Sequence, residues 1–147
     1  MGALANQARA YLDVPFVHRG RDRRGLDCAG LVWRCYADLG AVLPDLRRYG
    51  REPHRNGLVN AVNLALGEPL WAGAVGQLVR RTLLQVDDVL LIRFDLEPHH
   101  MAIVGDNHMH GVSMIHAYGQ IGVSRVVEHG LDDDWQRKIC AVYRRAV

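Results

Sequence analysis

The order of helical and strand-like patterns along the chain is the feature that most constrains its fold. Apolar residues recur at helical spacing in the first half, over residues 3–12, 28–39 and 58–66. Short β-prone runs separated by Asp, Asn, Gly and Pro fill the second half, at residues 86–94, 100–104, 112–117, 121–127 and 138–143. Helices first and strands afterwards predict an α+β domain with a mostly antiparallel sheet.

The boundaries of these elements follow from local signals. Asp27 is a good N-cap for the helix at residues 28–39, and Gly40 stops that helix. The first helix should end before the Val14-Pro15 pair, because a residue that precedes proline disfavours the helical region. We also expect a helix over residues 71–82 and a loop over residues 44–53.

Length and charge limit the classes of protein to which the chain can belong. At 147 residues it is predicted to form a single domain, residues 1–147. A net charge of +2 gives no argument for nucleic acid binding. We interpret the arginines at positions 19, 21, 23 and 24 as a solvated basic loop, or alternatively as a site that attracts an acidic peptide or a partner protein.

The chain carries neither a secretory signal nor a long apolar segment. Polar residues interrupt its first eleven positions, and charges interrupt every later apolar run well before about 20 residues. We therefore expect a soluble protein that is made in the cytoplasm and does not insert into a membrane.

Three cysteines, Cys28, Cys35 and Cys140, argue against a disulfide framework, because their number is odd. Cys28 and Cys35 are separated by two turns of one helix, about 10.5 Å of rise, which is too far for a disulfide bond. Cys35 on the apolar helix face and Cys140 in the last predicted strand are interpreted as core residues.

Cys28 follows the helix cap directly and so lies in the first helical turn. Unpaired backbone N–H groups and the helix dipole favour an anion at this position, which predicts a lowered thiol pKa. The alternative is that Cys28 is a small apolar core residue, as most free cysteines are. Gly30 costs the helix roughly 1 kcal/mol relative to alanine, so we expect close packing there or space for a substrate chain.

A thiol nucleophile needs a base, and two histidines in predicted strands are candidates. His100 opens the run at residues 100–104, and His116 lies within residues 112–117. In papain-like enzymes an imidazole accepts the thiol proton and a third polar group orients its other nitrogen, a role that His116 can fill. Alternatively, both are strand-edge histidines satisfied by solvent or backbone. Strand alternation does not distinguish His99 from His100.

Four motifs in register resemble the NlpC/P60 family of cysteine peptidases. An apolar-Pro-aromatic segment and a Gly-rich loop precede Asp27-Cys28-Ala29-Gly30-Leu31-Val32, which is similar to the family's Asp-Cys-Ser-Gly-Leu-Val motif. The other three motifs match strands of the family and are 85–91 (Gly-Asp-Leu-Val), 100–105 (His-x-x-Ile-x-x-Gly) and 115–117 (Ile-His-Ala).

This resemblance implies a papain-like NlpC/P60 fold with the nucleophile at a helix N-terminus packed on the sheet. Cys28 would be the nucleophile, His100 the general base and later acid, and His116 the residue that orients His100. The Cys28 backbone N–H would help to stabilise the oxyanion. Asp27, Phe16 and Ala29 would lie on the substrate side, with Ala29 in place of the usual serine and Phe16 in place of a frequent tyrosine.

The resemblance also implies a substrate and a setting. Relatives that act on cell wall usually cleave the bond between D-γ-glutamate and a diamino acid in the peptidoglycan stem peptide. Residues 46–53, 125–129 and 141–144 resemble a small stand-alone branch encoded among phage and phage-like tail genes. We therefore expect incorporation into a virion or phage-like tail, with tail-tip or hub proteins as partners and no cofactor.

Two rival interpretations stay open. The first is a structural component of the tail tip that keeps the fold without catalysis, which a thiol of ordinary pKa would favour. The second is a zinc site made from Cys28, His100 and His116, with His108 and His110 as another candidate pair, although the spacing matches no structural zinc motif.

Overall fold

A six-stranded antiparallel sheet with helices on both sides forms the body of the protein in a computed structural model, which describes residues 2–45, 57–94, 98–107, 109 and 111–147. The elements in chain order are α1 (Ala3–Arg9), β1 (Arg21–Asp22), β2 (Gly25–Leu26), α2 (Cys28–Asp38), α3 (Leu58–Leu66), β3 (Trp71–Ala72), a 3₁₀ turn η2 (Arg81–Leu83), β4 (Val89–Arg93), β5 (Pro98–Asn107), β6 (Gly111–Tyr118), β7 (Arg125–Gly130), α4 (Asp133–Lys138) and β8 (Ile139–Tyr143). The expected α+β class with a mostly antiparallel sheet is confirmed.

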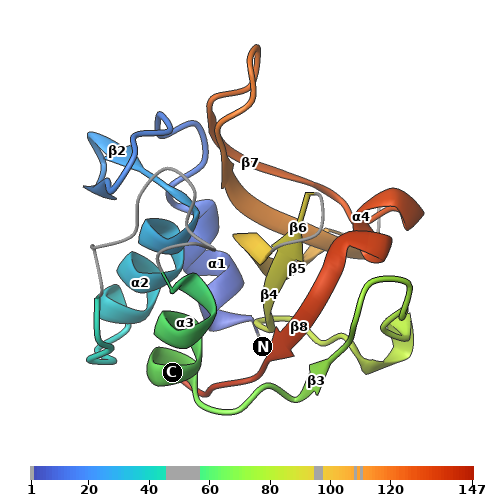
Figure 1. Ribbon diagram of the computed structural model, residues 1–147. Helices are drawn as coiled ribbons and strands as arrows, with labels where there is room; N and C mark the ends of the chain where they lie inside the picture. The colour runs from blue at the N-terminus through green and yellow to red at the C-terminus, as the bar shows by residue number, and fades with distance from the viewer. Residues whose placement is uncertain (1, 46–56, 95–97, 108, 110) are drawn as a thin grey trace.

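The sheet has the strand order β3-β8-β4-β5-β6-β7, and β1 and β2 form a separate hairpin. Helices α1, α2 and α3 lie on one side of the sheet, and α4 lies on the other (Figure 1). Within the part of the chain that the structure describes, no helix is long and apolar enough to cross a membrane.

Alternating residues of the strands fill a hydrophobic core on each face of the sheet. The core under α1, α2 and α3 takes its strand residues from Val89, Leu91, Met101, Ile103, Ile115, Ala117, Val126, Cys140, Ala141 and Tyr143, and the neighbours Cys140 and Ala141 lie at an irregularity in the pairing of β4 with β8. The core on the opposite face takes the intervening residues Leu90, Ile92, Ala102, Val104, Met114, Ile139 and Val142. Two-sided burial explains why β4 and β8 read as continuous apolar runs rather than as alternating ones.

One predicted element is wrong, and a second begins later than expected. Residues 71–82 are not a helix, because residues 71 and 72 pair with β8 as the edge strand β3 and a 3₁₀ turn follows only at Arg81–Leu83. Residues 121–124 do not belong to a strand. Gln120 instead accepts hydrogen bonds from the N–H groups of Val123 and Ser124, and Gly122 has a φ of 85°, so the chain turns before β7 begins.

Other boundaries moved or were missed. The first helix ends at Arg9, three residues earlier than expected, and a turn leads to Asp13, whose φ is 72°. Helix α4 was missed, although it carries the usual signals. The Asp132 side chain accepts a hydrogen bond from the Trp135 N–H as N-cap, acidic residues occupy its first turn and basic residues its last.

Gly30 is required where α2 packs against the β1–β2 hairpin. A Cβ atom at this position would lie 2.0 Å from the carbonyl oxygen of Gly20 and 2.7 Å from Nη1 of Arg21. Close packing, which was one of the two reasons expected for Gly30, is therefore confirmed.

We predict that Gly30→Ala destabilises the protein by about 2 kcal/mol or more, since the methyl group would collide with backbone and such overpacking typically costs 1–3 kcal/mol. Urea unfolding followed by circular dichroism measures this loss. Ala37→Gly on the same helix is the control and should cost only about 1 kcal/mol of helix propensity. A Gly30→Ala protein as stable as wild type would contradict the packing argument.

Candidate active site

The start of α2 is held in place by the buried carboxylate of Asp27. Its Oδ1 accepts hydrogen bonds from the Gly30 N–H at 2.7 Å and from Nη1 of Arg21 at 2.8 Å, and its Oδ2 accepts from the Arg19 N–H at 2.8 Å. Asp27 was predicted as N-cap, and that role is confirmed. The cap, the hairpin and the position of Cys28 are therefore fixed by one carboxylate.

The interpretation of Arg21 as part of a solvated basic loop is wrong. Its side chain is only 5% exposed and makes ion pairs with Asp27 at 2.8 Å and with Asp45 at 3.0 Å. Two carboxylates require a cation when all three groups leave water, so this arginine is drawn inside. Arg19, Arg23 and Arg24 are exposed, as predicted.

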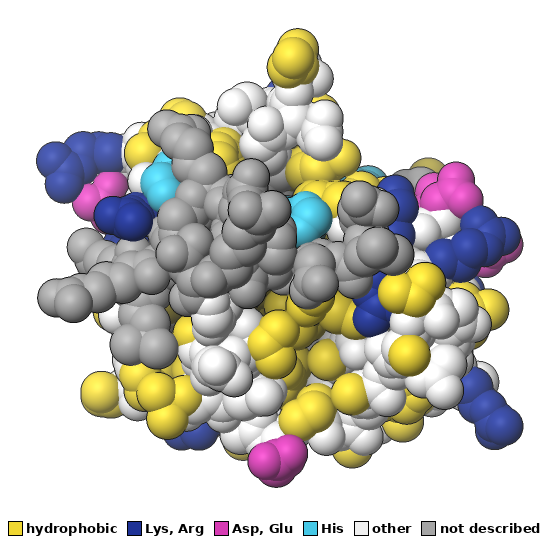
Figure 2. Space-filling view, viewed as in Figure 1, with side chains coloured by type: hydrophobic (Ala, Val, Ile, Leu, Met, Phe, Trp, Pro, Cys, Tyr) yellow, Lys and Arg dark blue, Asp and Glu magenta, His cyan; other side chains and the backbone are white. Residues whose placement is uncertain are grey.

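A cleft with a volume of about 210 Å³ opens beside Cys28. Its lining residues come from the segment before α2, from the ends of β4 and β6, and from the start of β5, and are Phe16, His18, Asp27, Cys28, Phe94, His99, His100, Tyr118, Gly119 and Gln120. In the surface view, Lys and Arg side chains gather over the β1–β2 hairpin, and histidine side chains are visible beside them and nearer the middle of the same face (Figure 2).

The structure brings most of the predicted site residues together. Cys28, His100, Asp27 and Phe16 all line the cleft, and Phe16 is placed there by a bridge of its backbone to Leu26. Ala29 is not among the lining residues of this cleft. His99 lines it beside His100, so strand alternation did not separate the two histidines on different sides of the site.

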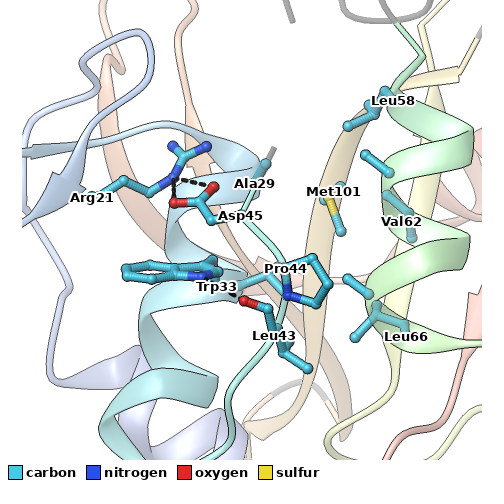
Figure 3. A pocket seen from close by; sticks show the side chains of 13 residues that line it. Arg21, Ala29, Trp33, Leu43, Pro44, Asp45, Leu58, Val62, Leu66 and Met101 are labelled. Atoms are coloured by element: carbon cyan, nitrogen blue, oxygen red, sulfur yellow. Dashed lines mark hydrogen bonds and ion pairs between the residues drawn. The ribbon is translucent and has the colours of Figure 1, made fainter. Parts of the chain in front are cut away.

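Ala29 instead lines a second pocket of about 50 Å³ between α2 and α3. Figure 3 shows Arg21 and Asp45 paired at one end of this pocket and apolar side chains, including Val62 and Met101, along the rest of it. A substrate contact of Ala29 therefore stays a prediction.

His100, His116 and a third residue, His129, form a line of hydrogen-bonded rings. Nε2 of His100 lies 2.6 Å from Nδ1 of His116, and Nε2 of His116 lies 2.8 Å from Nε2 of His129. His116 thus contacts the second nitrogen of His100, which is the geometry expected of an orienting group. Sequence reasoning gave His129 no role, because pairing of β6 with β7 alone brings it next to His116.

Burial keeps both inner histidines neutral. His100 is 4% exposed and His116 is fully buried. Desolvation, reinforced by the neighbouring histidines, lowers the pKa of His100 to about 3 and that of His116 to about 2. Aromatic rings enclose the pair, with Trp135 of α4 5.3 Å from the His116 ring centroid and Phe94 5.1 Å from that of His100.

Burial also acts on the thiol, against the expectation of a lowered pKa. Desolvation, followed by the negative charge of Asp27, raises the pKa of Cys28 to about 12. Backbone hydrogen bonds from Met101 and Ala29 and the charge of Arg21 act in the opposite direction. The predicted lowering of the Cys28 pKa is therefore wrong. Cys28 is only 8% exposed, and the loss of water around its thiol outweighs the contacts that stabilise the thiolate.

The free site therefore holds a neutral thiol and a neutral imidazole. Among the described side chains, no hydrogen bond joins Cys28 to His100, although both line the cleft. Catalytic hydrogen bonds are often long or absent in a site without substrate and form in the complex. His100 uses Nε2 for His116, which leaves Nδ1 as the nitrogen available to accept the thiol proton.

A zinc site made from Cys28, His100 and His116 does not fit this geometry. Two nitrogens on one tetrahedral zinc lie roughly 3.3 Å apart, whereas these histidines are joined at hydrogen-bond distance. No group of three or more potential ligands with metal-binding geometry occurs among the residues that the structure describes. His108 and His110 lie outside those residues.

The remaining cysteines are core residues, as predicted. Cys35 is fully buried within the core under the helices, and Cys140 is 6% exposed, with its thiol donating to the Leu91 carbonyl at 3.3 Å. Burial raises the pKa of both thiols. Neither borders the cleft, so Cys28 is the cysteine with access to a ligand there.

Comparison with known proteins identifies the family. The NlpC/P60 family pattern matches residues 13–144, which is most of the chain. The chain belongs to the NlpC/P60 family. Both Cys28, at the start of α2, and His100, in β5, lie within the matched residues. No match was found among curated proteins.

Solved structures confirm the papain-like NlpC/P60 fold. An NlpC/P60 family protein from Bacillus cereus ATCC 10987 aligns with a TM-score of 0.60 and 22% identity over 97% of this chain and 39% of that chain. The NlpC/P60 domain of peptidoglycan hydrolase SagA aligns with a TM-score of 0.57 and 19% identity over 97% of this chain and 96% of that chain. An N-acetylmuramoyl-L-alanine amidase from Bacteroides uniformis ATCC 8492 aligns with a TM-score of 0.55 and 14% identity over 98% of each chain.

We predict that Cys28 of the free protein alkylates slowly at neutral pH, because a raised pKa leaves less thiolate than in an ordinary cysteine, whose pKa is about 8.5. Its rate of reaction with iodoacetamide should still be rising above pH 9. Mass spectrometry that locates the label on Cys28 measures the rate, with Cys28→Ala as the control. A plateau reached below pH 8 would show that the helix N-terminus outweighs burial.

Arg21→Met should cost about 3–5 kcal/mol of unfolding free energy, since it leaves the buried Asp27 carboxylate and the partly buried Asp45 carboxylate without their cation. Arg24→Met is the matched control. Its ion pair with Asp22 is solvent-exposed and screened by water, so its loss should leave the free energy of unfolding nearly unchanged. Denaturant unfolding compares the two, and equal losses would mean that Arg21 is not the cation on which this site depends.

Proposed function

We propose that this protein is a cysteine endopeptidase of bacterial cell wall that cleaves the peptidoglycan stem peptide. The observation that carries the proposal is the convergence of Cys28 and His100 on one cleft, with His116 bonded to the far nitrogen of His100. Family membership supports it, and so do the names of structural relatives, which include a peptidoglycan hydrolase and an amidase.

The chemistry would follow from this arrangement. His100 Nδ1 takes the thiol proton as the Cys28 sulfur attacks the carbonyl carbon of the scissile amide. The backbone N–H of Cys28 at the start of α2 stabilises the oxyanion. The C–N bond then breaks, the leaving amine takes the proton back from His100, and water hydrolyses the resulting thioester with His100 as base.

For the bond, we propose the one between D-γ-glutamate and a diamino acid, which relatives acting on cell wall usually cleave. The cleft offers Phe16, His18, His99 and Tyr118 for contacts with the stem peptide. Asp27 has its carboxylate engaged with Gly30, Arg19 and Arg21, so its contribution to binding would be indirect, through the position of Cys28.

The test is incubation with peptidoglycan and soluble muropeptides of different stem chemistry, with products read by mass spectrometry. Wild type should release stem-peptide fragments, Cys28→Ala none, and His100→Ala about 10²–10⁴-fold less, which is the usual contribution of a general base. Fragment masses name the bond. Cleavage that persists in Cys28→Ala would exclude this site as its origin.

The alternative function is a structural component of a phage or phage-like tail tip that keeps the fold without catalysis. The thiol of ordinary pKa that was expected for this alternative is not what the structure gives, but a raised pKa likewise leaves little thiolate at neutral pH and so supports a site without catalysis. Absence of product from every wall type, together with a Cys28 that resists alkylation at all pH values, would select this alternative.

A place in the tail is proposed for either function. It is supported by the resemblance of three segments to proteins encoded among phage and phage-like tail genes. Residues 125–129 lie in β7, residues 141–144 lie at the end of β8 and just after it, and residues 46–53 lie outside the described residues. Mass spectrometry of particles purified from producing cells should detect the protein together with tail-tip or hub proteins. Its confinement to the soluble fraction after particle removal would contradict this setting.

A further inference from the structure

His129 ends the line of histidines and has no part in the Cys-His-His set. It lies on β7, opposite Met114 of β6, and its Nδ1 lies 3.0 Å from the carbonyl oxygen of its neighbour Gly130. The other nitrogen, Nε2, contacts His116 at 2.8 Å. Every nitrogen from His100 Nε2 to His129 Nδ1 therefore has a hydrogen-bond partner.

The Gly130 carbonyl fixes the direction of all these bonds. A carbonyl oxygen only accepts, so Nδ1 of His129 carries the hydrogen, and Nε2 of a neutral His129 accepts from Nε2–H of His116. Neutral His116 then has an unprotonated Nδ1, which accepts from Nε2–H of His100. It follows that His100 presents an unprotonated Nδ1, which is the state a general base requires.

The three rings differ in their access to water. His100 is 4% exposed and His116 is fully buried, whereas His129 is partly exposed. A positive charge is therefore least costly on His129, the ring closest to solvent.

The groups that face His129 are few in the described part of the chain. They are His116 from β6, which contacts it, His100 from β5, whose charge interacts with it, and Trp135 from α4, whose ring centroid lies 5.5 Å from that of His129. The Lys138 ammonium lies 5.0 Å from the Trp135 ring, and no described carboxylate is hydrogen-bonded to His129. A proton on His129 thus depends on solvent and on the Gly130 carbonyl for stabilisation.

We propose that His129 is a positioning residue that sets the tautomer of His100 and receives the proton displaced from Cys28. This inference rests on the proposed function of the same site. It adds a fourth member to the set, acting through His116 and without contact to substrate.

The proton transfers balance. The S–H bond of Cys28 breaks, and its proton binds Nδ1 of His100. The Nε2 proton of His100 then moves to Nδ1 of His116. Finally, the Nε2 proton of His116 moves to Nε2 of His129. The products are a thiolate, two neutral histidines and an imidazolium at His129. The reverse sequence returns a proton through His100 Nδ1 to the leaving amine.

Acid should block this sequence. Once His129 is protonated from solvent, its Nε2–H donates to His116, both inner histidines reverse their tautomers, and Nδ1 of His100 carries a hydrogen toward the cleft. His100 then has no free position for the thiol proton. Replacement of His129 should therefore change the acid limb of the activity profile.

Two variants separate the parts of this proposal. His129→Gln keeps an amide oxygen that accepts from Nε2–H of His116, but does not take up a proton. His129→Leu offers neither. Thermal unfolding of both variants checks that the fold is retained.

The first readout is the ¹⁵N chemical shift of the His100 ring nitrogens in the free protein, assigned with the His100→Ala variant. Wild type and His129→Gln should both show an unprotonated Nδ1, and His129→Leu a mixture of tautomers. An unchanged His100 tautomer in His129→Leu would overturn the tautomer assignment. This readout needs no substrate, so it tests the tautomer assignment even if the protein proves to have no activity on cell wall.

The second readout is the pH dependence of Cys28 alkylation and of kcat/KM on muropeptides. His129→Gln should lower both by about tenfold or more, mainly through kcat, and should shift the acid limb. Wild-type rates and an unshifted acid limb in His129→Gln would place the proton on His100 or His116 and overturn the relay. Equal rates of Cys28 alkylation in wild type and His129→Gln would by themselves overturn the relay, whatever the activity on muropeptides.

Discussion

The position of the nucleophile depends on the buried carboxylate of Asp27. It caps α2, holds the backbone at Arg19 and pairs with the Arg21 guanidinium, so one side chain joins the helix that carries Cys28 to the hairpin beside it. Gly30 allows these two parts to approach, since any larger side chain would meet the hairpin backbone. The energetic cost of burying two charges is offset by a full set of hydrogen bonds, and the result is a fixed first turn.

A second constraint is the competition between burial and ionisation. Burial raises the pKa of the thiol and lowers that of the imidazole, so both effects oppose the ion pair that a cysteine peptidase uses. In the proposed mechanism, the thiol proton needs an outlet that is less buried than His100. The line of rings to His129 supplies such an outlet, and the aromatic side chains of Phe94, Tyr118 and Trp135 keep the inner rings away from water.

The sequence predicted much of the fold because its signals were local. The N-cap and the end of α2 were predicted from local signals, and the limits of α3 were confirmed. The apolar runs located β5 and β6 within a few residues. The predicted helix at residues 71–82 failed because edge pairing with β8 outweighed helical spacing. Likewise, Arg21 was misjudged because no local signal shows that Asp45, far along the chain, lies against it.

The sequence by itself determined the α+β class, the family resemblance, and Cys28, His100 and His116 as the candidate set, since residue types and their spacing carry those signals. Only the tertiary structure decided the protonation state of the thiol, the place of Ala29 outside the cleft, and the contact of His129 with His116. Burial and cross-strand neighbours arise from the packing of segments distant in sequence, and pKa values and hydrogen-bond direction depend on those neighbours rather than on the residue itself.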